Sequence, residues 1–192
     1  GRLELAGSED APILLEPLGE GDFGGVVVHG PDARLTARHA TFREGGPILV
    51  PGLSLDEDSD GGAIYAHGGA SVVLEDCAFE ACRVANRGGA ITILEPGTSL
   101  LARRCRFTVN SASESGGAVA IGHGGRGLIE ESRFLRNRAK VGAGLLVLGH
   151  GGPRKEELVL TRVELRSCHF EGNRARTEGG AIQLYRRSRL KV

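Results

Sequence analysis

Short segments in which apolar and polar residues alternate surround four phenylalanines of the chain, Phe79, Phe107, Phe134 and Phe170. These segments are rich in Val, Ile, Leu and Thr, and their alternation is typical of β-strands rather than of helices, whose period is about 3.6 residues. Glycines follow each segment, and glycine supplies the positive φ or the close backbone approach that a sharp corner needs. The pattern therefore predicts short strands joined by tight corners.

The four segments are copies of one repeat. From phenylalanine to phenylalanine the steps are 28, 27 and 36 residues, and an insertion around 151–157 lengthens the last step. A period of this size indicates stacked units, each too small to bury its own hydrophobic face. Three further positions recur: two residues before the phenylalanine come Cys77, Cys105, Ser132 and Cys168, three residues after it Cys82, Asn110, Asn137 and Asn173, and ten residues after it Gly89, Gly117, Gly144 and Gly180.

A unit of roughly 27 residues has room for three short strands with three corners, which is one coil of a parallel β-helix. The first third of the chain carries a looser form of the same pattern, with glycine pairs at 24–25, 45–46 and 61–62. We therefore expect an all-β protein, a right-handed parallel β-helix of about six or seven coils. No linker divides the chain, so 1–192 is expected to form a single domain.

Equivalent positions of successive coils lie directly above one another in a β-helix, at an inter-strand spacing of about 4.8 Å. The asparagines should therefore stack, with their amides bonding to each other or to turn backbone groups, because a buried polar group must be hydrogen-bonded. The cysteines are expected to be free and buried as small core residues. A disulfide between Cys77 and Cys105 on adjacent coils is the alternative, since the Cα separation would allow it.

The Phe-x-x-Asn and Gly-Gly-Ala-Ile motifs, complete at Phe170 to Ile182 and slightly varied at Phe107 to Val119, resemble the repeats of the polymorphic outer-membrane protein family. These are surface adhesins with autotransported β-helical passengers. The segment Phe23-Gly24-Gly25-Val26 is similar to an aromatic-Gly-Gly-Ile motif in broader bacterial right-handed β-helix proteins. The resemblance implies an adhesin-like role in an extracellular or cell-surface location, and the chain is expected to be a segment of a larger protein.

Charge composition limits the partners that the chain should bind. Lys plus Arg equals Asp plus Glu at 24 each, so no global field attracts nucleic acid or an acidic membrane surface. The sequence holds no transmembrane run. The expected partners are a protein or glycan surface ligand and neighbouring domains of the parent chain, with neither nucleic acid binding nor membrane insertion of this segment.

Basic residues follow the asparagine position and form the candidate ligand site. They are Arg83, Arg87, Arg138 and Arg174. Such a stripe is predicted to lie on one exposed face, where it would either maintain solubility or hold an anionic glycan.

Two groups of residues are candidate metal ligands. Asp56, Asp58 and Asp60 alternate in an acidic stretch, and carboxylate oxygens suit calcium, although the stretch matches no known calcium loop. His123 and His150 begin His-Gly-Gly triplets and are predicted to lie at one corner of adjacent coils, where they could share a metal ion. The competing interpretations are a solvated loop and turns whose histidine tolerates an unusual backbone angle. Calcium is thus a possible ion, and no other cofactor is indicated.

The alternative to a scaffold is a carbohydrate-active β-helix, either a polysaccharide lyase or a glycoside hydrolase, or an accessory domain of a larger enzyme, since many parallel β-helices cleave polysaccharides. An inverting glycoside hydrolase needs two carboxylates about 6.5–9.5 Å apart. The carboxylates that precede the phenylalanine strands are Glu75, Asp76, Glu130, Glu131 and Glu164. No hydrolase signature, Ser-His-Asp pattern or phosphate loop accompanies them, and only two Tyr and no Trp are available to stack on sugars. We therefore expect a non-enzymatic scaffold for adhesion or partner binding.

Overall fold

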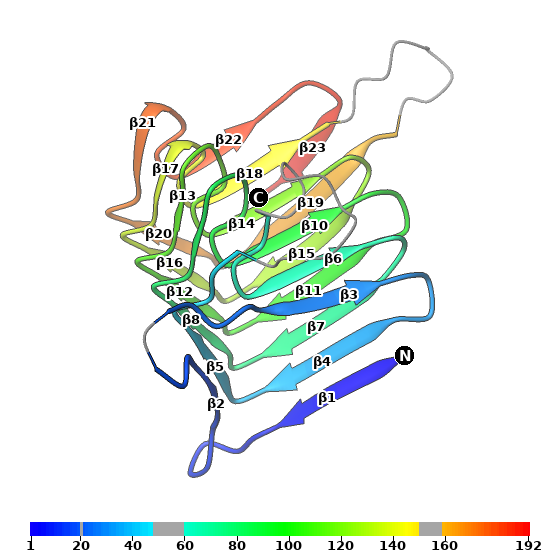
Figure 1. Cartoon of the computed structure of the whole chain (residues 1–192). Helices are drawn as coiled ribbons and strands as arrows, with labels where there is room; N and C mark the ends of the chain where they lie inside the picture. The colour runs from blue at the N-terminus through cyan, green and yellow to red at the C-terminus, as the bar shows by residue number, and fades with distance from the viewer. Residues whose placement is uncertain (20, 48–59, 150–158) are drawn as a thin grey trace.

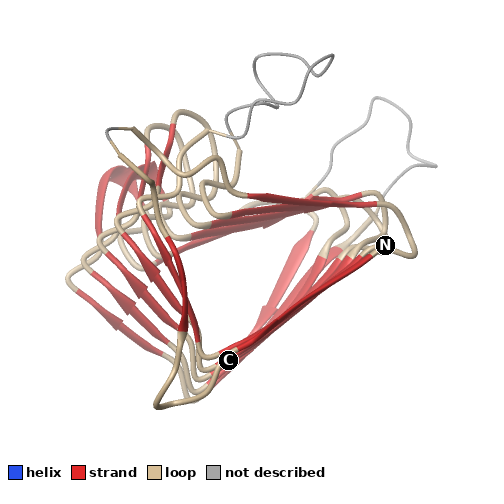
Figure 2. Cartoon of the chain, turned by 60° about the horizontal axis from the view of Figure 1, so that its bottom comes forward, coloured by secondary structure: helices blue, strands red, loops and turns tan. Residues whose placement is uncertain are grey.

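The computed structural model describes residues 1–19, 21–47, 60–149 and 159–192. Every strand pairing among them is parallel, and the strands form four stacked sheets. Together with the repeat, this arrangement is the predicted right-handed parallel β-helix (Figure 1). Viewed nearer to its axis, the coil has a roughly triangular outline with strands along its sides (Figure 2). No helix in the described residues has the length and apolarity needed to cross a bilayer.

Sheet 1 has the most strands of the four sheets, and its number of strands gives the number of coils. It contains β1 (Arg2–Ala6), β4 (Arg34–Arg38), β7 (Ser71–Glu75), β11 (Ser99–Arg103), β15 (Arg126–Glu130), β19 (Thr161–Arg166) and β23 (Ser188–Lys191), in that spatial order. The seven strands agree with the prediction of six or seven coils.

Each coil continues from sheet 1 into sheet 2 and closes through sheet 4. Sheet 2 contains β2 (Ile13–Leu15), β5 (Ala40–Arg43), β8 (Ala78–Glu80), β12 (Arg106–Thr108), β16 (Arg133–Leu135) and β20 (His169–Glu171). Sheet 4 contains β3 (Val26–His29), β6 (Ile64–His67), β10 (Ile91–Leu94), β14 (Val119–Gly122), β18 (Leu145–Leu148) and β22 (Ile182–Leu184).

A fourth strand lies between sheets 2 and 4, where three strands per coil were predicted. Sheet 3 contains β9 (Arg83–Val84), β13 (Ser111–Ala112), β17 (Arg138–Val141) and β21 (Arg174–Glu178). Two of these strands are only two residues long, which is too short to show an alternating pattern in the sequence. Sheet 3 begins directly after the asparagine turn and carries three of the four predicted arginines, Arg83, Arg138 and Arg174.

The core confirms the alignment on phenylalanine. Phe42, Phe79, Phe107 and Phe134 are fully buried, and together with Phe170 they form one stack with ring centroids 4.4 to 5.0 Å apart. Buried aliphatic side chains from sheets 1 and 4 fill the remainder of the interior. The stack fixes the register of sheet 2, because a slip of one residue would move the rings to the outer face.

Two different constraints account for the glycine pairs. The first glycine has a positive φ, 65° at Gly88 and 63° at Gly116. The second lies against backbone, since a Cβ at Gly89 would come 2.1 Å from the carbonyl oxygen of Gly117. The predicted equivalence of Gly144 with Gly117 is wrong: Val119 pairs with Leu145, which places Gly117 opposite Ala143. A register shift between β17 and β21 accompanies this shorter copy.

All four cysteines are free, as predicted, and the alternative disulfide between Cys77 and Cys105 is not formed. Cys77, Cys82 and Cys105 are buried, whereas Cys168 is partly exposed. Cys82 occupies the asparagine position of its coil, and its backbone N–H donates to Asn110 Oδ1 at 3.0 Å.

Candidate functional site

Three of the four predicted arginines share one register position on the outer face of sheet 3. Arg83 pairs with Ser111, Ser111 with Arg138, and Arg138 with Arg174. The next residue of each strand, such as Ala112 or Ala139, points inward, so strand alternation directs the arginines outward. The repeat therefore brings together side chains that are far apart in the sequence.

A groove of about 430 Å³ runs over this part of sheet 3. Arg138, Arg174 and Arg176 line it, and small Ser and Ala residues form its floor. Arg176 was not predicted, and its guanidinium donates to the Ser113 carbonyl oxygen at 2.8 Å. Its position two residues after Arg174 in an alternating strand was the available signal.

The positive charge of Arg83, Arg138 and Arg174 is not compensated within the described part of the protein. Arg83, Arg138 and Arg174 are exposed, and none makes a side-chain hydrogen bond or ion pair with another described residue. Lys140 on the same sheet differs, because its Nζ lies 2.9 Å from Glu114 Oε2. We refer to Arg83, Arg138 and Arg174 as the sheet 3 arginine row.

Arg87 lies outside this row and has a structural partner. It forms an isolated bridge with Ser115, its guanidinium lies 3.4 Å from Asp60 Oδ2, and its backbone N–H donates to Asp60 Oδ1 at 2.9 Å. Asp60 is completely buried. An unpaired buried carboxylate would be costly, so Arg87 acts here as its counter-ion.

Comparison with known proteins agrees with this geometry. The model of the right-handed β-helix region matches residues 24–192. The chain belongs to the right-handed β-helix family. Searches of curated proteins and of solved structures find no significant match. The family match supports the β-helix repeat, and it does not separate the polymorphic outer-membrane protein repeats from other repeats of this fold.

The metal-ligand predictions fall largely on residues outside the described ranges. Asp56, Asp58 and His150 lie there, and Asp60 contacts Arg87 as above. His123 has a φ of 52° at a turn after β14, which agrees with the interpretation of an unusual turn angle. Within the described ranges, no group of three or more His, Cys, Asp or Glu side chains could hold a metal ion. Metal binding by this β-helix therefore stays a prediction.

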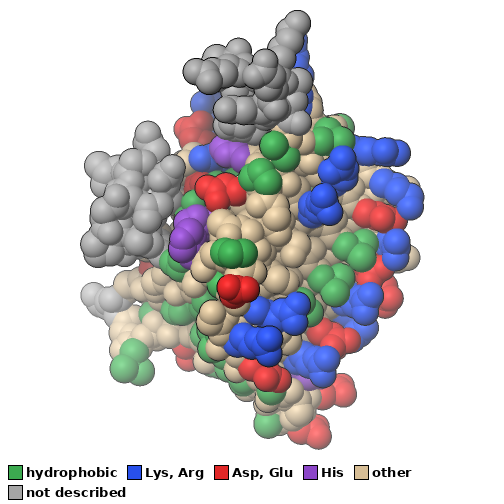
Figure 3. Space-filling view, turned by 90° about the vertical axis from the view of Figure 1, so that its right-hand side faces the viewer, with side chains coloured by type: hydrophobic (Ala, Val, Ile, Leu, Met, Phe, Trp, Pro, Cys, Tyr) green, Lys and Arg blue, Asp and Glu red, His purple; other side chains and the backbone are tan. Residues whose placement is uncertain are grey.

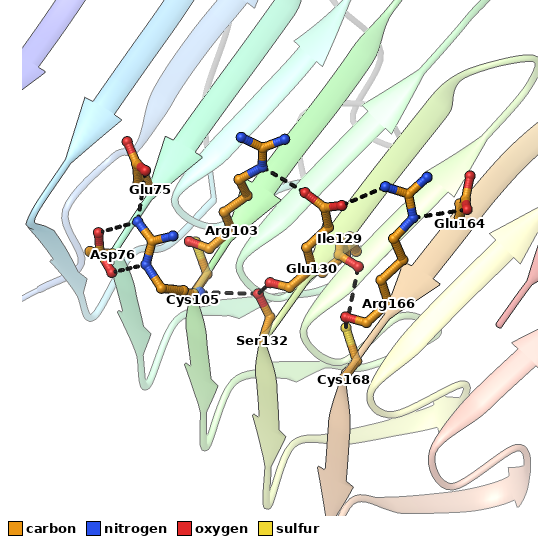
Figure 4. A network of polar contacts seen from close by, with 11 residues as sticks. Glu75, Asp76, Arg103, Cys105, Ile129, Glu130, Ser132, Glu164, Arg166 and Cys168 are labelled. Carbon is orange, nitrogen blue, oxygen red and sulfur yellow. Dashed lines mark hydrogen bonds and ion pairs between the residues drawn. The ribbon is translucent and has the colours of Figure 1, made fainter.

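Four of the five carboxylates that precede the phenylalanine strands, Glu75, Asp76, Glu130 and Glu164, contact arginines at or near the C-terminal ends of the sheet 1 strands (Figure 4). Glu131 is exposed and makes no ion pair with another described residue. Glu130 lies 2.6 Å from Arg103 and 2.8 Å from Arg166. Arg104 contacts Asp76 at 2.8 Å and Glu75 at 2.7 Å. Arg166 also lies 3.0 Å from Glu164, which contacts Lys191 at 2.8 Å.

These contacts favour the ionised form of Asp76, Glu130 and Glu164. Hydrogen bonding from Arg104 lowers the pKa of Asp76, that from Arg103 lowers the pKa of Glu130, and that from Lys191 and Arg166 lowers the pKa of Glu164. A general acid requires the opposite shift, since it must hold a proton near neutral pH. The paired carboxylates are therefore suited to holding the coils in register rather than to donating a proton.

Proposed function

We propose that this β-helix protein is a non-enzymatic extracellular or cell-surface scaffold that binds an anionic glycan through the sheet 3 arginine row. The observation that carries the proposal is that Arg83, Arg138 and Arg174 share one register position without a side-chain partner among the described residues. The groove beside Arg138 and Arg174 offers the space for a ligand.

Electrostatics favours an anionic ligand at this row. Arg138 and Arg174 lie directly opposite each other on adjacent strands, and like charges in that arrangement destabilise a sheet. A carboxylate or sulfate placed between them would relieve the repulsion. Guanidinium groups also bind such groups with two parallel hydrogen bonds, which gives geometric specificity.

Adhesion is favoured over glycan cleavage by the state of the acidic residues. The lowered pKa values of Asp76, Glu130 and Glu164 oppose a general-acid role in glycoside hydrolysis. The surface location rests on the resemblance to polymorphic outer-membrane protein repeats, with the neighbouring domains of the parent chain as further partners.

A glycan array that contains acidic and neutral glycans tests the binding function. We expect the wild-type protein to bind acidic glycans and the variant Arg138→Ser with Arg174→Ser to lose that binding. Arg106→Ser with Arg133→Ser is the matched control, because it removes the same charge from exposed positions of sheet 2. Equal loss in both variants would contradict a site on sheet 3.

Assays of reducing-sugar release from acidic polysaccharides, with and without calcium, test the enzymatic alternative. We expect no turnover in either condition. Turnover that the wild-type protein supports would overturn the proposal of a non-enzymatic scaffold and would favour a carbohydrate-active β-helix.

A further inference from the structure

The strand β21 of sheet 3 contains one extra residue beside the groove. β17 and β21 change register between Ala139 and Val141 of β17, and across that step β21 has one residue more than β17. This count defines a β-bulge. Arg176 and Thr177 lie in the bulge, and both are exposed, although consecutive residues of a regular strand face opposite sides. The bulge therefore redirects side chains at this edge of the groove, which is a common role of bulges beside functional sites.

The side chain of Arg176 extends across the middle strand of the groove. Its guanidinium donates to the carbonyl oxygen of Ser113 at 2.8 Å. Ser113 directly follows β13, and β17 lies between β13 and β21 in the sheet. The side chain must therefore pass over β17, the strand that carries Arg138. The bond to Ser113 uses one of the five N–H donors of the guanidinium and holds this group in place, which lowers the entropy that a ligand would cost it.

Three arginines thus border one small space. Arg138, Arg174 and Arg176 line the groove of about 430 Å³, and the other described residues that line it are Ser and Ala, so none of them is acidic. On the side of the protein shown in Figure 3, which faces away from sheet 3, basic and acidic side chains lie next to one another. The groove of sheet 3 therefore concentrates positive charge that its own lining does not neutralise.

We propose that this groove selects a sulfate or phosphate ester of a sugar over a sugar carboxylate, and that Arg176 determines the selectivity. The inference rests on the proposed function of the sheet 3 arginine row and names the acid group of its glycan. A carboxylate offers two oxygens in one plane, which the guanidinium groups of Arg138 and Arg174 can bind. A sulfate or phosphate monoester offers three terminal oxygens in a tripod, so a third oxygen is available to Arg176.

Charge and shape make separable contributions to this selectivity. A phosphate monoester carries a charge of about −1.5 to −2 at pH 7, so three arginines should bind it most tightly. A sulfate monoester carries a single negative charge, as a carboxylate does. A comparison of a sulfate ester with a carboxylate therefore reports the tripod geometry, and a comparison of the two esters reports the charge.

Titration of the full chain, followed by NMR, with glucose 6-phosphate, glucose 6-sulfate, glucuronate and glucose tests the proposal. We expect glucose 6-sulfate to bind about tenfold or more tightly than glucuronate, since it gains a third charge-assisted hydrogen bond. Glucose 6-phosphate should bind at least as tightly as the sulfate, and glucose should not bind. Glucuronate that binds as tightly as glucose 6-sulfate would overturn the proposal.

The variant Arg176→Gln tests the role of the bulge residue. It should lower the affinity for glucose 6-sulfate to about that for glucuronate and should change the glucuronate affinity little, and the retained glucuronate binding shows that the variant is folded. Arg133→Gln is the matched control, because it removes an exposed arginine from sheet 2, and it should keep the preference for the ester. Equal losses for the two ligands in Arg176→Gln, or a lost preference in Arg133→Gln, would overturn the assignment of Arg176.

The outcomes separate this inference from the proposed function. If glucuronate and the two esters bind equally, and all three lose affinity in the variant Arg138→Ser with Arg174→Ser, the selectivity fails and anionic glycan binding by the sheet 3 arginine row stands. If none of the three acidic sugars binds more tightly than glucose and the acidic glycans of the array do not bind either, both fail. Binding of the esters that needs Arg138, Arg174 and Arg176 supports both.

Discussion

Asn137 accepts two hydrogen bonds from Asn110 through a single oxygen. Its Oδ1 atom lies 2.9 Å from the backbone nitrogen of Asn110 and 3.1 Å from Asn110 Nδ2. The Asn137 amide nitrogen donates in turn to the Phe107 carbonyl oxygen at 3.0 Å and to Asn173 Oδ1 at 2.9 Å. Both Asn110 and Asn137 are fully buried, so this ladder satisfies polar groups that no water reaches.

Replacing Asn137 by leucine should lower the free energy of unfolding by several kcal/mol. The substitution leaves the Asn110 backbone N–H without its acceptor, removes one of the two acceptors of the Asn110 side-chain amide, and removes a donor from the Phe107 carbonyl. An orphaned buried group costs about 1–3 kcal/mol. Urea unfolding measures the change. Ser111→Ala, at a half-buried surface position one residue from the ladder, is the control and should shift the midpoint little. An unchanged midpoint for Asn137→Leu would mean that the ladder contributes nothing to stability.

The sequence was sufficient to predict the phenylalanine stack and the asparagine ladder, because both lie at a fixed distance from the corner that follows sheet 2. The sequence was not sufficient to predict the register of the strands that follow that corner. The third copy reaches Leu145 one residue earlier than the second copy reaches Val119, counted from Phe134 and Phe107 respectively, and the register shift next to β17 absorbs the difference. A count from the phenylalanine therefore misplaces Gly144.

The candidate sites show the same limit. Arg83, Arg138 and Arg174 follow the asparagine position directly, so the repeat was enough to group them. Arg87 instead directly precedes Gly88-Gly89, as Asp60 precedes Gly61-Gly62 one coil earlier. Alignment on the glycine pairs would therefore have placed Arg87 beside buried Asp60, whereas grouping by the asparagine position did not.

The row of residues at the first register position of the sheet 1 strands could have been found by aligning the repeats on phenylalanine. Five of its members stand eight residues before a stacked phenylalanine: Arg34 before Phe42, Ser71 before Phe79, Ser99 before Phe107, Arg126 before Phe134 and Arg162 before Phe170. The alignment does not show which of these side chains have a partner of opposite charge. The structure shows that the ion pairs of sheet 1 lie at the C-terminal ends of its strands, where Glu130 contacts Arg103 and Arg166.

Truncation of Phe107 to alanine should destabilise the protein by about 3–5 kcal/mol, the range for large core truncations. Its ring is fully buried and stacks on Phe79 at 5.0 Å and on Phe134 at 4.7 Å. Phe170→Ala is the matched control, because Phe170 is partly exposed and stacks on Phe134. Urea midpoints should fall clearly more for Phe107→Ala, and equal shifts would contradict an interior position for Phe107.

Acid should destabilise the protein through the carboxylates of sheet 1. The pKa values of Asp76, Glu130 and Glu164 are lowered in the folded protein by their basic partners, so the unfolded chain binds protons at a higher pH than the folded one. The stabilisation is therefore complete above the unfolded pKa values, near pH 4, and is lost as the pH falls through the folded values.

Urea midpoints measured between pH 7 and pH 2.5 test this dependence. The variant Arg103→Gln with Arg166→Gln removes both partners of Glu130 and should flatten the loss of stability at acid pH. An acid dependence identical to that of the wild type would show that the ion pairs of Glu130 do not contribute to it.

Thiol accessibility should follow the burial of the four cysteines. Burial raises the pKa of Cys82 to about 12, and the Cys77 thiol together with burial raises the pKa of Cys105. Since the thiolate is the reactive form, these thiols should resist a thiol reagent in the native protein. Cys168 is partly exposed and should react first, although burial raises its pKa as well.

Titration before and after denaturation measures the thiols directly. We expect slow labelling of about one thiol in the native wild type, the loss of that labelling in Cys168→Ser, and four reactive thiols in the denatured wild type, one for each free cysteine. The denatured count distinguishes the two arrangements of the core, because a disulfide between Cys77 and Cys105 would withhold two thiols until a reductant is added. A denatured count that rises only with reductant, together with its loss in Cys77→Ser, would replace the free-thiol core with a covalent link between adjacent coils.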